Sequence, residues 1–234
     1  MEINGITAGI IAVVVAYLMG SIPGAYIVTR FLTGKDIRKL GGGNVGANNV
    51  YNEVGLKAAI PVALIDVGKG AAAVIIAHRL VGLPLMQTPG LPQIFVLASA
   101  LAAVVGHIWP IYLRFAGGNG LATTIGILAI LMPRELLIAL ALAVVLIVIT
   151  RNLVLSVNLS LLTLLVFAWF SADPRQYFIF LIILALILII HFVPDAKAAL
   201  TKAGSKEKLL AELVRMDENS KKPKREKKSK SRSN

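Results

Sequence analysis

Two segments rich in glycine and asparagine interrupt an otherwise apolar chain. The first runs from Gly41 to Asn49 and the second from Ala116 to Gly120. Small side chains leave their backbone N–H groups accessible, which is typical of the nests that bind phosphate. Because hydrocarbon cannot hydrogen-bond a bare backbone, such loops in a membrane protein belong in water or around a polar ligand. The pattern predicts a site for an anionic substrate at one membrane face, although an ordinary interhelical turn also explains the first loop taken alone.

Ionisable side chains lie in the apolar segments beside these loops. Asp66 and Lys69 are three residues apart, so on a helix they share one face and can pair. A charge at membrane depth costs about 2.5–3.5 kcal/mol and normally faces a cavity or a partner. Two interpretations stay open: an ion pair that joins helices, or a lysine directed at phosphate and held by the aspartate. His107 is either a hydrogen-bonded packing residue or part of the same site.

The second loop precedes an apolar segment that is too short to cross a bilayer. Residues 120–132 reach about 20 Å as a helix, whereas the hydrocarbon core is about 30 Å thick. Pro133 follows, so we expect a half-length helix that begins at the loop and directs its N-terminal amides at an anion. The alternative is one kinked helix that continues through the next segment.

The composition requires several membrane-spanning elements to position these residues. The chain of 234 residues is 57% hydrophobic, with a mean hydropathy of +0.79. These values predict an all-α polytopic bundle of about seven helices. We place them at residues 3–28, 56–82, 93–113, 120–132, 135–150, 153–171 and 176–193. The chain has no cysteine, and its three histidines form no HExxH-type pair, so we expect no metal and no cofactor.

Basic residues predict the orientation. Twenty lysines and arginines fall on one side of the predicted helices and three on the other, while Lys69 lies within a helix. The positive-inside rule then predicts an external N-terminus, a cytoplasmic C-terminus and both glycine loops on the cytoplasmic side of the membrane.

The chain divides into a membrane domain, residues 1–194, and a basic tail, residues 195–234, which we expect to be largely disordered. The tail is explained as a solvated charge run that enforces topology, or as a segment attracted to anionic lipid. We expect no nucleic-acid partner, because aromatic residues are not interleaved with the charges.

Five motifs give the chain a resemblance to a known family, over about residues 16–193. They are Gly20-Ser21-Ile22-Pro23, the run from Gly34 to Asn49, Asp66-Val67-Gly68-Lys69-Gly70, Gly106-His107-Ile108-Trp109-Pro110 and the run from Phe115 to Thr123. In this order the chain resembles the bacterial acyl-phosphate-dependent glycerol-3-phosphate acyltransferases.

The resemblance implies seven helices, a cytosolic site and no CoA. It implies transfer of a fatty acyl group from acyl phosphate to the 1-hydroxyl of glycerol 3-phosphate, which yields lysophosphatidic acid, with membrane lipids as surroundings. Taken with the residues, it predicts Lys69 and His107 as catalytic. Substrate contacts are expected from Arg38, Gly43, Asn44, Gly46, Asn49, Asp66, Gly117, Gly118, Asn119 and His191.

The sequence departs from the family pattern at several polar positions. Gly42 and Asn48 stand where the family has serine and threonine. Asn52 stands where the family has arginine, and Ala116 and Asn119 stand where it has lysine. Pro194 stands where the family has asparagine. Three cations are therefore absent, and Arg38, Arg114 or Arg151 could replace them. The alternative function is an impaired or substrate-shifted paralogue that binds lipid or a partner. A transporter is a third interpretation, but no inverted repeat is evident.

Overall fold

The computed structural model describes residues 5–82, 91–151, 153–170 and 175–203, and these residues are helical with short connections. In chain order the helices are α1 (Gly5–Gly20), α2 (Gly24–Thr33), α3 (Ala47–Glu53), α4 (Leu56–Leu80), α5 (Leu91–Ile108), α6 (Leu121–Leu131), α7 (Pro133–Thr150), α8 (Leu153–Phe170) and α9 (Arg175–Ala203). Two 3-10 turns, η1 (Ile37–Lys39) and η2 (Ile111–Leu113), lie in the loops. The predicted all-α architecture is confirmed.

Four helical stretches in the described part are long and apolar enough to cross a membrane: Gly5–Thr33, Leu56–Leu80, Pro92–Leu113 and Pro133–Thr150. Three more are apolar but shorter: Leu121–Leu131, Leu155–Trp169 and Arg175–His191. The predicted count of seven spans includes these shorter helices and stays a prediction.

The first predicted helix, residues 3–28, is wrong as a single element. The chain leaves the helix after Gly20, and α2 begins at Gly24. Pro23 has no N–H to continue the ladder, and its ring disfavours helical geometry at Ile22. The break leaves the Ile22 carbonyl available for another partner, which becomes important at the site.

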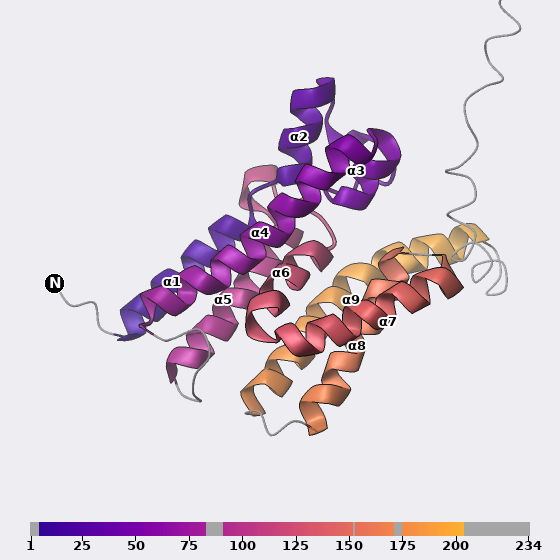
Figure 1. Ribbon diagram of the computed structural model, residues 1–234. Helices are drawn as coiled ribbons and strands as arrows, with labels where there is room; N and C mark the ends of the chain where they lie inside the picture. The colour runs from indigo at the N-terminus through magenta and orange to yellow at the C-terminus, as the bar shows by residue number, and fades with distance from the viewer. Residues whose placement is uncertain (1–4, 83–90, 152, 171–174, 204–234) are drawn as a thin grey trace, which may run out of the picture.

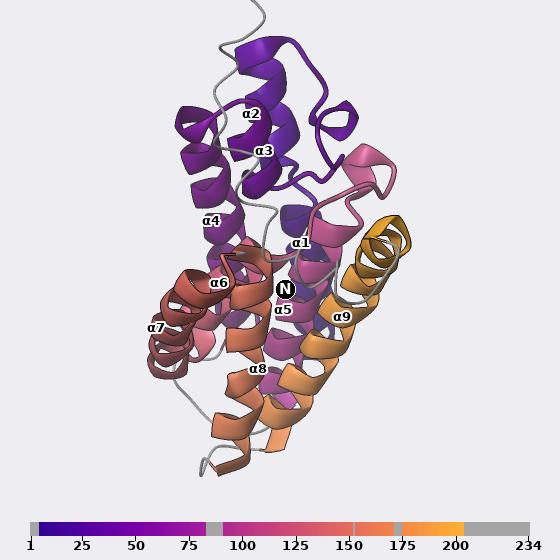
Figure 2. The same cartoon turned by 90° about the vertical axis from the view of Figure 1, so that its right-hand side faces the viewer.

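The half-length helix exists as α6. Gly120 precedes it in the left-handed region, at φ 78°. Met132, at φ −144° and ψ 61°, ends α6, and Pro133 opens α7, which leaves in a different direction (Figures 1 and 2). The kinked single helix is therefore wrong.

The last predicted helix, residues 176–193, is too short, because α9 continues through Pro194 to Ala203. The predicted boundary at residue 194 thus falls inside a helix. The rest of the basic tail, residues 204–234, lies outside the described residues.

Small residues allow the helices that position the site to approach closely. A Cβ at Gly20 would meet the carbonyl of Ala103, so α1 and α5 pack backbone to backbone there. A Cβ at Gly126 would meet the carbonyl of Val67, which joins α6 to α4 in the same manner. Such small-residue contacts are usual where helices associate in lipid.

A second, smaller core lies at the end of the molecule where α2 and α3 gather (Figures 1 and 2). Its buried members come from α2, η1, the first glycine loop, α3, α4 and η2, and include Ala25, Ile37, Val45, Val50, Val62 and Leu113. Because one apolar cluster anchors both segments that flank the glycine loops, these loops are held on a packed base.

Candidate active site

The two glycine loops, residues 41–49 and 116–120, meet to form what we call the glycine cradle. The Val45 N–H donates to the Gly117 carbonyl at 3.2 Å. The Asn44 side-chain amide donates to the side-chain oxygen of Asn119. Loops more than 70 residues apart in sequence are therefore joined directly, as the prediction of a shared face requires.

Asn49 braces the first loop from inside. Its Nδ2 donates to the carbonyls of Leu40 at 3.1 Å and Asn44 at 2.9 Å, while its Oδ1 accepts from the Gly42 N–H at 3.3 Å. Gly43 lies within this loop at φ 74°, a conformation that suits glycine. Asn49 is buried, so these hydrogen bonds shape the loop from within. Its predicted contact with substrate stays a prediction.

Gly46 precedes α3 in extended geometry, and its N–H lies outside the helix. A Cβ there would come within 3.0 Å of Asn44 Oδ1, so glycine leaves room for the asparagine that bridges the loops. The predicted substrate residues of the first loop are therefore one connected unit.

A buried charge cluster lies beneath the cradle. Lys69 Nζ is 2.7 Å from Asp66 Oδ1 and donates to the Ile22 carbonyl at 2.9 Å. The side chains of Lys69 and Asp66 are only 5% and 2% exposed. The predicted ion pair on one face of α4 is confirmed, and it also joins α4 to the break between α1 and α2.

His107, at the end of α5, connects this pair to the cradle. Its Nδ1 lies 3.5 Å from Asp66 Oδ1 and 3.1 Å from the Thr123 hydroxyl on α6. Its Nε2 faces Gly118, where a Cβ would overlap the ring nitrogen. The imidazole therefore bridges α4, α5 and α6 with one edge and faces the glycine cradle with the other.

The second loop has no room for a side chain at Gly117 or Gly118. A Cβ at Gly117 would overlap the His107 carbonyl, and the Gly118 N–H donates to that same carbonyl at 3.2 Å. Two bulky residues enter this loop in the left-handed region, Arg114 at φ 54° and Phe115 at φ 65°. Such backbone strain is characteristic of ligand sites.

Arg38 lies beside the cradle but is already paired. It donates to Asp36 at 2.7 Å, reaches the Leu113 carbonyl at 3.4 Å and lies over the Tyr26 ring. The hydrogen bond from Arg38 lowers the pKa of the Asp36 carboxyl, and the same contact raises the pKa of the guanidinium. Arg38 thus ties the first loop to η2, while Arg114 is exposed next to the second loop and Arg151 lies between α7 and α8.

His191, on α9, packs its ring edge-on against Trp109, with centroids 5.9 Å apart. Trp109 follows α5 two residues after His107. The contact brings α9 next to the segment that leads into the second loop.

The sequence interpretation missed two partners of the site. The Ile22 carbonyl binds Lys69, and the Thr123 hydroxyl meets His107. The proline after Ile22 was a usable signal, because it interrupts a helix in an apolar span. Thr123 carried no signal of its own, because its partner is sixteen residues away in sequence.

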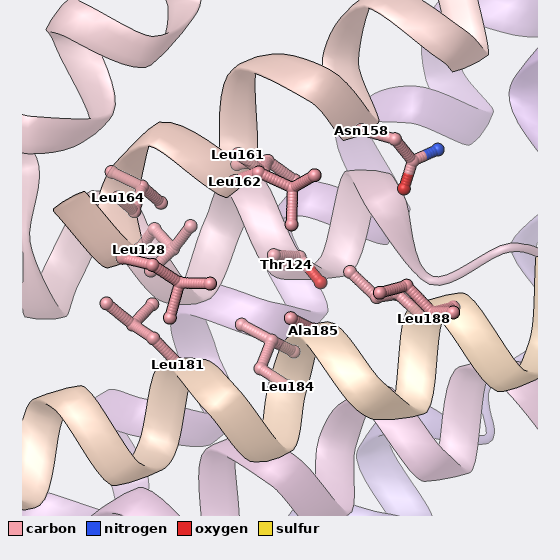
Figure 3. A pocket seen from close by; sticks show the side chains of 12 residues that line it. Thr124, Leu128, Asn158, Leu161, Leu162, Leu164, Leu181, Leu184, Ala185 and Leu188 are labelled. Carbon is pink, nitrogen blue, oxygen red and sulfur yellow. The ribbon is translucent and has the colours of Figure 1, made fainter.

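An apolar cavity lies on the far side of α6, between α6, α8 and α9 (Figure 3). Ten of its twelve lining side chains are aliphatic, and Thr124 and Asn158 are the polar ones. The cavity volume is about 60 Å³, and the cavity is partly open to the surroundings of the protein. The first turns of α6 therefore separate a polar cradle from an apolar cavity.

Comparison with known sequences gives one consistent result. A family model described as glycerol-3-phosphate acyltransferase matches residues 10–202. "Glycerol-3-phosphate acyltransferase 1" of Dehalococcoides mccartyi is 37% identical over 215 residues, which is 89% of this chain and 100% of the relative. "Glycerol-3-phosphate acyltransferase" of Thermoanaerobacter pseudethanolicus is 37% identical over 200 residues, 86% of this chain and 95% of the relative.

Solved structures give the same result for the fold. The glycerol 3-phosphate form of PlsY (YgiH), an integral membrane glycerol 3-phosphate acyltransferase, superposes with a TM-score of 0.73 at 26% identity. The match covers 83% of this chain and 92% of PlsY. The lysophosphatidic acid form of PlsY has the same fold, with a TM-score of 0.71 at 24% identity. This match also covers 83% of this chain and 92% of PlsY.

Proposed function

Since this chain belongs to the glycerol-3-phosphate acyltransferase family and is an integral membrane acyltransferase, we propose that acyl phosphate is its donor and that the glycine cradle holds both substrates. The enzyme transfers a fatty acyl group to glycerol 3-phosphate, and the product is lysophosphatidic acid. The two relatives compared above carry this activity in their names, and this chain covers 100% and 95% of their lengths.

The reaction needs little covalent help from the protein. The glycerol 1-hydroxyl oxygen forms a bond to the acyl carbonyl carbon, the bond from that carbon to the phosphate oxygen breaks, and inorganic phosphate leaves. The hydroxyl proton goes to the departing phosphate or to solvent, so no general base is assigned. The protein has to bring two anions together, offset their repulsion and align hydroxyl and carbonyl.

The cradle supplies donors for those anions. The first amides of α6, those of Leu121 to Thr123, have no acceptor within the helix. They lie beside the second loop, where the dipole of α6 adds partial positive charge. Asn44 and Asn119 add side-chain amides at the junction of the loops. We assign these groups to phosphate binding.

Lys69 and His107 are proposed to act from below the cradle. The Lys69 ammonium holds the break at Ile22 and adds positive charge to the buried cluster. His107 faces the cradle through Nε2, where it can exchange a hydrogen bond with a substrate oxygen. Asp66 holds both side chains in place. Asp66 Oδ2, which has no hydrogen-bond partner among the described residues, leaves the cluster one free acceptor.

The acyl chain is assigned to the cavity between α6, α8 and α9. Its aliphatic lining suits hydrocarbon, with about 0.8 kcal/mol gained per buried CH2. Thr123 and Thr124 are neighbours on α6, so the cavity begins one residue from the cluster beneath the cradle, and we assign to it the chain of a donor whose phosphate is bound in the cradle.

The juxtaposition of the two glycine loops over the buried Lys69–Asp66–His107 cluster carries this proposal. The test is turnover of palmitoyl phosphate and glycerol 3-phosphate by the purified protein, with release of phosphate and formation of lysophosphatidic acid followed together. A Gly118→Ala variant is the inactive control. Turnover with palmitoyl phosphate but not with palmitoyl-CoA is expected.

The same assay separates the alternative, a paralogue that binds but does not catalyse. Two observations support it: Arg38 and Lys69 are each paired with a carboxylate, and Asn119 accepts a hydrogen bond from another amide. Absence of turnover, with glycerol 3-phosphate still raising the thermal stability of the protein, would support that alternative.

We further propose that the protein spans a bacterial inner membrane with its N-terminus outside and the cradle facing the cytoplasm. The twenty basic residues predicted on the cytoplasmic side support this orientation. Both substrates then reach the site from the compartment in which they are made.

A further inference from the structure

Consecutive threonines on α6 face different surroundings. The Thr123 hydroxyl meets His107 at 3.1 Å, beneath the cradle. The Thr124 hydroxyl is buried, has no hydrogen-bond partner among the described residues and points into the apolar cavity (Figure 3). One peptide unit therefore connects the polar cluster to the cavity.

The cavity continues away from Thr124 in one direction along three helices. On α6 the next lining residue is Leu128, one turn further from the cradle. On α9 the lining runs from Leu188 through Ala185 to Leu181, again one turn at a time. Apart from Thr124 and Asn158, the lining is aliphatic, which suits a hydrocarbon chain.

A buried hydroxyl without a partner is unfavourable, and a ligand that supplies an acceptor removes that cost. In an acyl phosphate the carbonyl is bonded directly to a phosphate oxygen, and the hydrocarbon begins on its other side. A donor that spans from the cradle to the cavity therefore has its carbonyl beside the first turns of α6. Thr124 is the polar side chain that lines the cavity on this helix.

We propose that Thr124 positions the donor by hydrogen-bonding its acyl carbonyl, and that the space beside Ala185 sets which chain lengths are accepted. This inference rests on the proposed function, because it assigns residues within that donor site. Thr124 acts on the reacting group, whereas Ala185 acts on the chain. Ala185 is the smallest side chain in the lining, so a larger side chain at this position would take up space in the cavity (Figure 3).

Thr124→Val tests the hydroxyl, because it keeps the branched shape. We expect kcat/KM for palmitoyl phosphate to fall about three- to tenfold, the range of one hydrogen bond. The KM for glycerol 3-phosphate stays the same and thermal stability is equal or higher, since a buried unpaired hydroxyl is removed. Thr124→Ser restores turnover. Wild-type kinetics in Thr124→Val, or a loss of thermal stability that tracks the loss of activity, would overturn the role.

Ala185→Phe tests the cavity by filling it. We expect the ratio of kcat/KM for palmitoyl phosphate to that for butyryl phosphate to fall at least about tenfold, the equivalent of losing two buried methylenes. Ala141→Phe is the matched control, because Ala141 is exposed on α7 and does not line the cavity. Equal losses with both donors, or the same shift in the control, would refute the assignment.

A binding measurement keeps the test independent of turnover. Palmitoyl lysophosphatidic acid should raise the thermal stability of the wild type and of Ala141→Phe, but not of Ala185→Phe. If the wild type fails to turn over any donor, the proposed function is wrong. The stabilisation by lysophosphatidic acid then still tests whether the cavity binds an acyl chain. If lysophosphatidic acid stabilises Ala185→Phe as well as the wild type, the cavity assignment is wrong even in an active enzyme.

Discussion

Replacing Lys69 by methionine tests whether the buried cluster holds the site together. The ammonium is lost from two contacts, with Asp66 Oδ1 at 2.7 Å and with the Ile22 carbonyl at 2.9 Å. The charged hydrogen bond to Ile22 accounts for about 1.5–3 kcal/mol. Asp66 also becomes a buried carboxylate with only His107 beside it, and breaking a buried pair in this way costs about 3–5 kcal/mol. We expect Lys69→Met to lower the free energy of unfolding by about 3–5 kcal/mol.

The measurement is unfolding in detergent micelles, followed by the fluorescence of the two tryptophans. Lys57→Met is the matched control, because Lys57 is exposed on the same helix and its loss should change stability by less than about 0.5 kcal/mol. The double variant Lys69→Met, Asp66→Asn removes both charges. Because no uncompensated carboxylate remains, it should recover at least half of the stability lost in the single variant.

The activity of that double variant then distinguishes a role of Lys69 in stability from a role in the reaction. If Lys69 also offsets substrate charge, the folded double variant loses about ten- to 150-fold in kcat/KM, the equivalent of about 1.5–3 kcal/mol. Should Lys69→Met unfold like the wild type, the argument from burial and pairing is refuted, whatever happens to turnover. A fully active double variant would instead remove Lys69 from the chemistry.

The remaining predictions concern the cradle, the loop brace and the orientation. Gly118→Ala should abolish turnover because its Cβ overlaps a histidine ring nitrogen, whereas Gly42→Ala, with open space around its Cβ, should stay active; equal activities would contradict the geometry. Because Arg38 lowers the pKa of Asp36 in the fold, that pair stabilises the protein fully at neutral pH and is lost as the pH falls below about 3.9. The stability difference between the wild type and Asp36→Asn should therefore narrow in acid unfolding, and a constant difference would refute the pairing. The chain has no cysteine, so Ser229→Cys should react with a membrane-impermeant thiol reagent only after cells are opened; labelling of intact cells would reverse the predicted orientation.

Much of the architecture could be predicted from the sequence, because lipid allows few backbone solutions. In lipid the backbone cannot hydrogen-bond to water, so long apolar runs form helices. The short apolar run that ends at Pro133 therefore predicted a half-length helix. The ion pair between Asp66 and Lys69 followed from their spacing alone, since three residues nearly complete one turn. These inferences are local, and the structure agrees with them.

The errors arose where a local pattern was ambiguous. Apolar composition continues through residues 21–23, so hydropathy predicted one helix where backbone chemistry at Pro23 made two. At the other end, the polar composition after Val193 predicted that the last helix ends at residue 193, yet α9 continues to Ala203. The composition of a segment indicates whether it lies in lipid or in water, but it does not give the residue at which a helix begins or ends.

By itself the sequence determined the class of the protein, the polar loops and the pairing within a helical turn, because each depends on residues that are neighbours in the chain. Tertiary structure alone decided the rest: that Asn44 meets Asn119, that Lys69 binds the Ile22 carbonyl, and that Thr123 and Thr124 face different sites. Those contacts depend on the close approach of helices at small residues such as Gly20 and Gly126, and no spacing along one segment specifies which helix comes near.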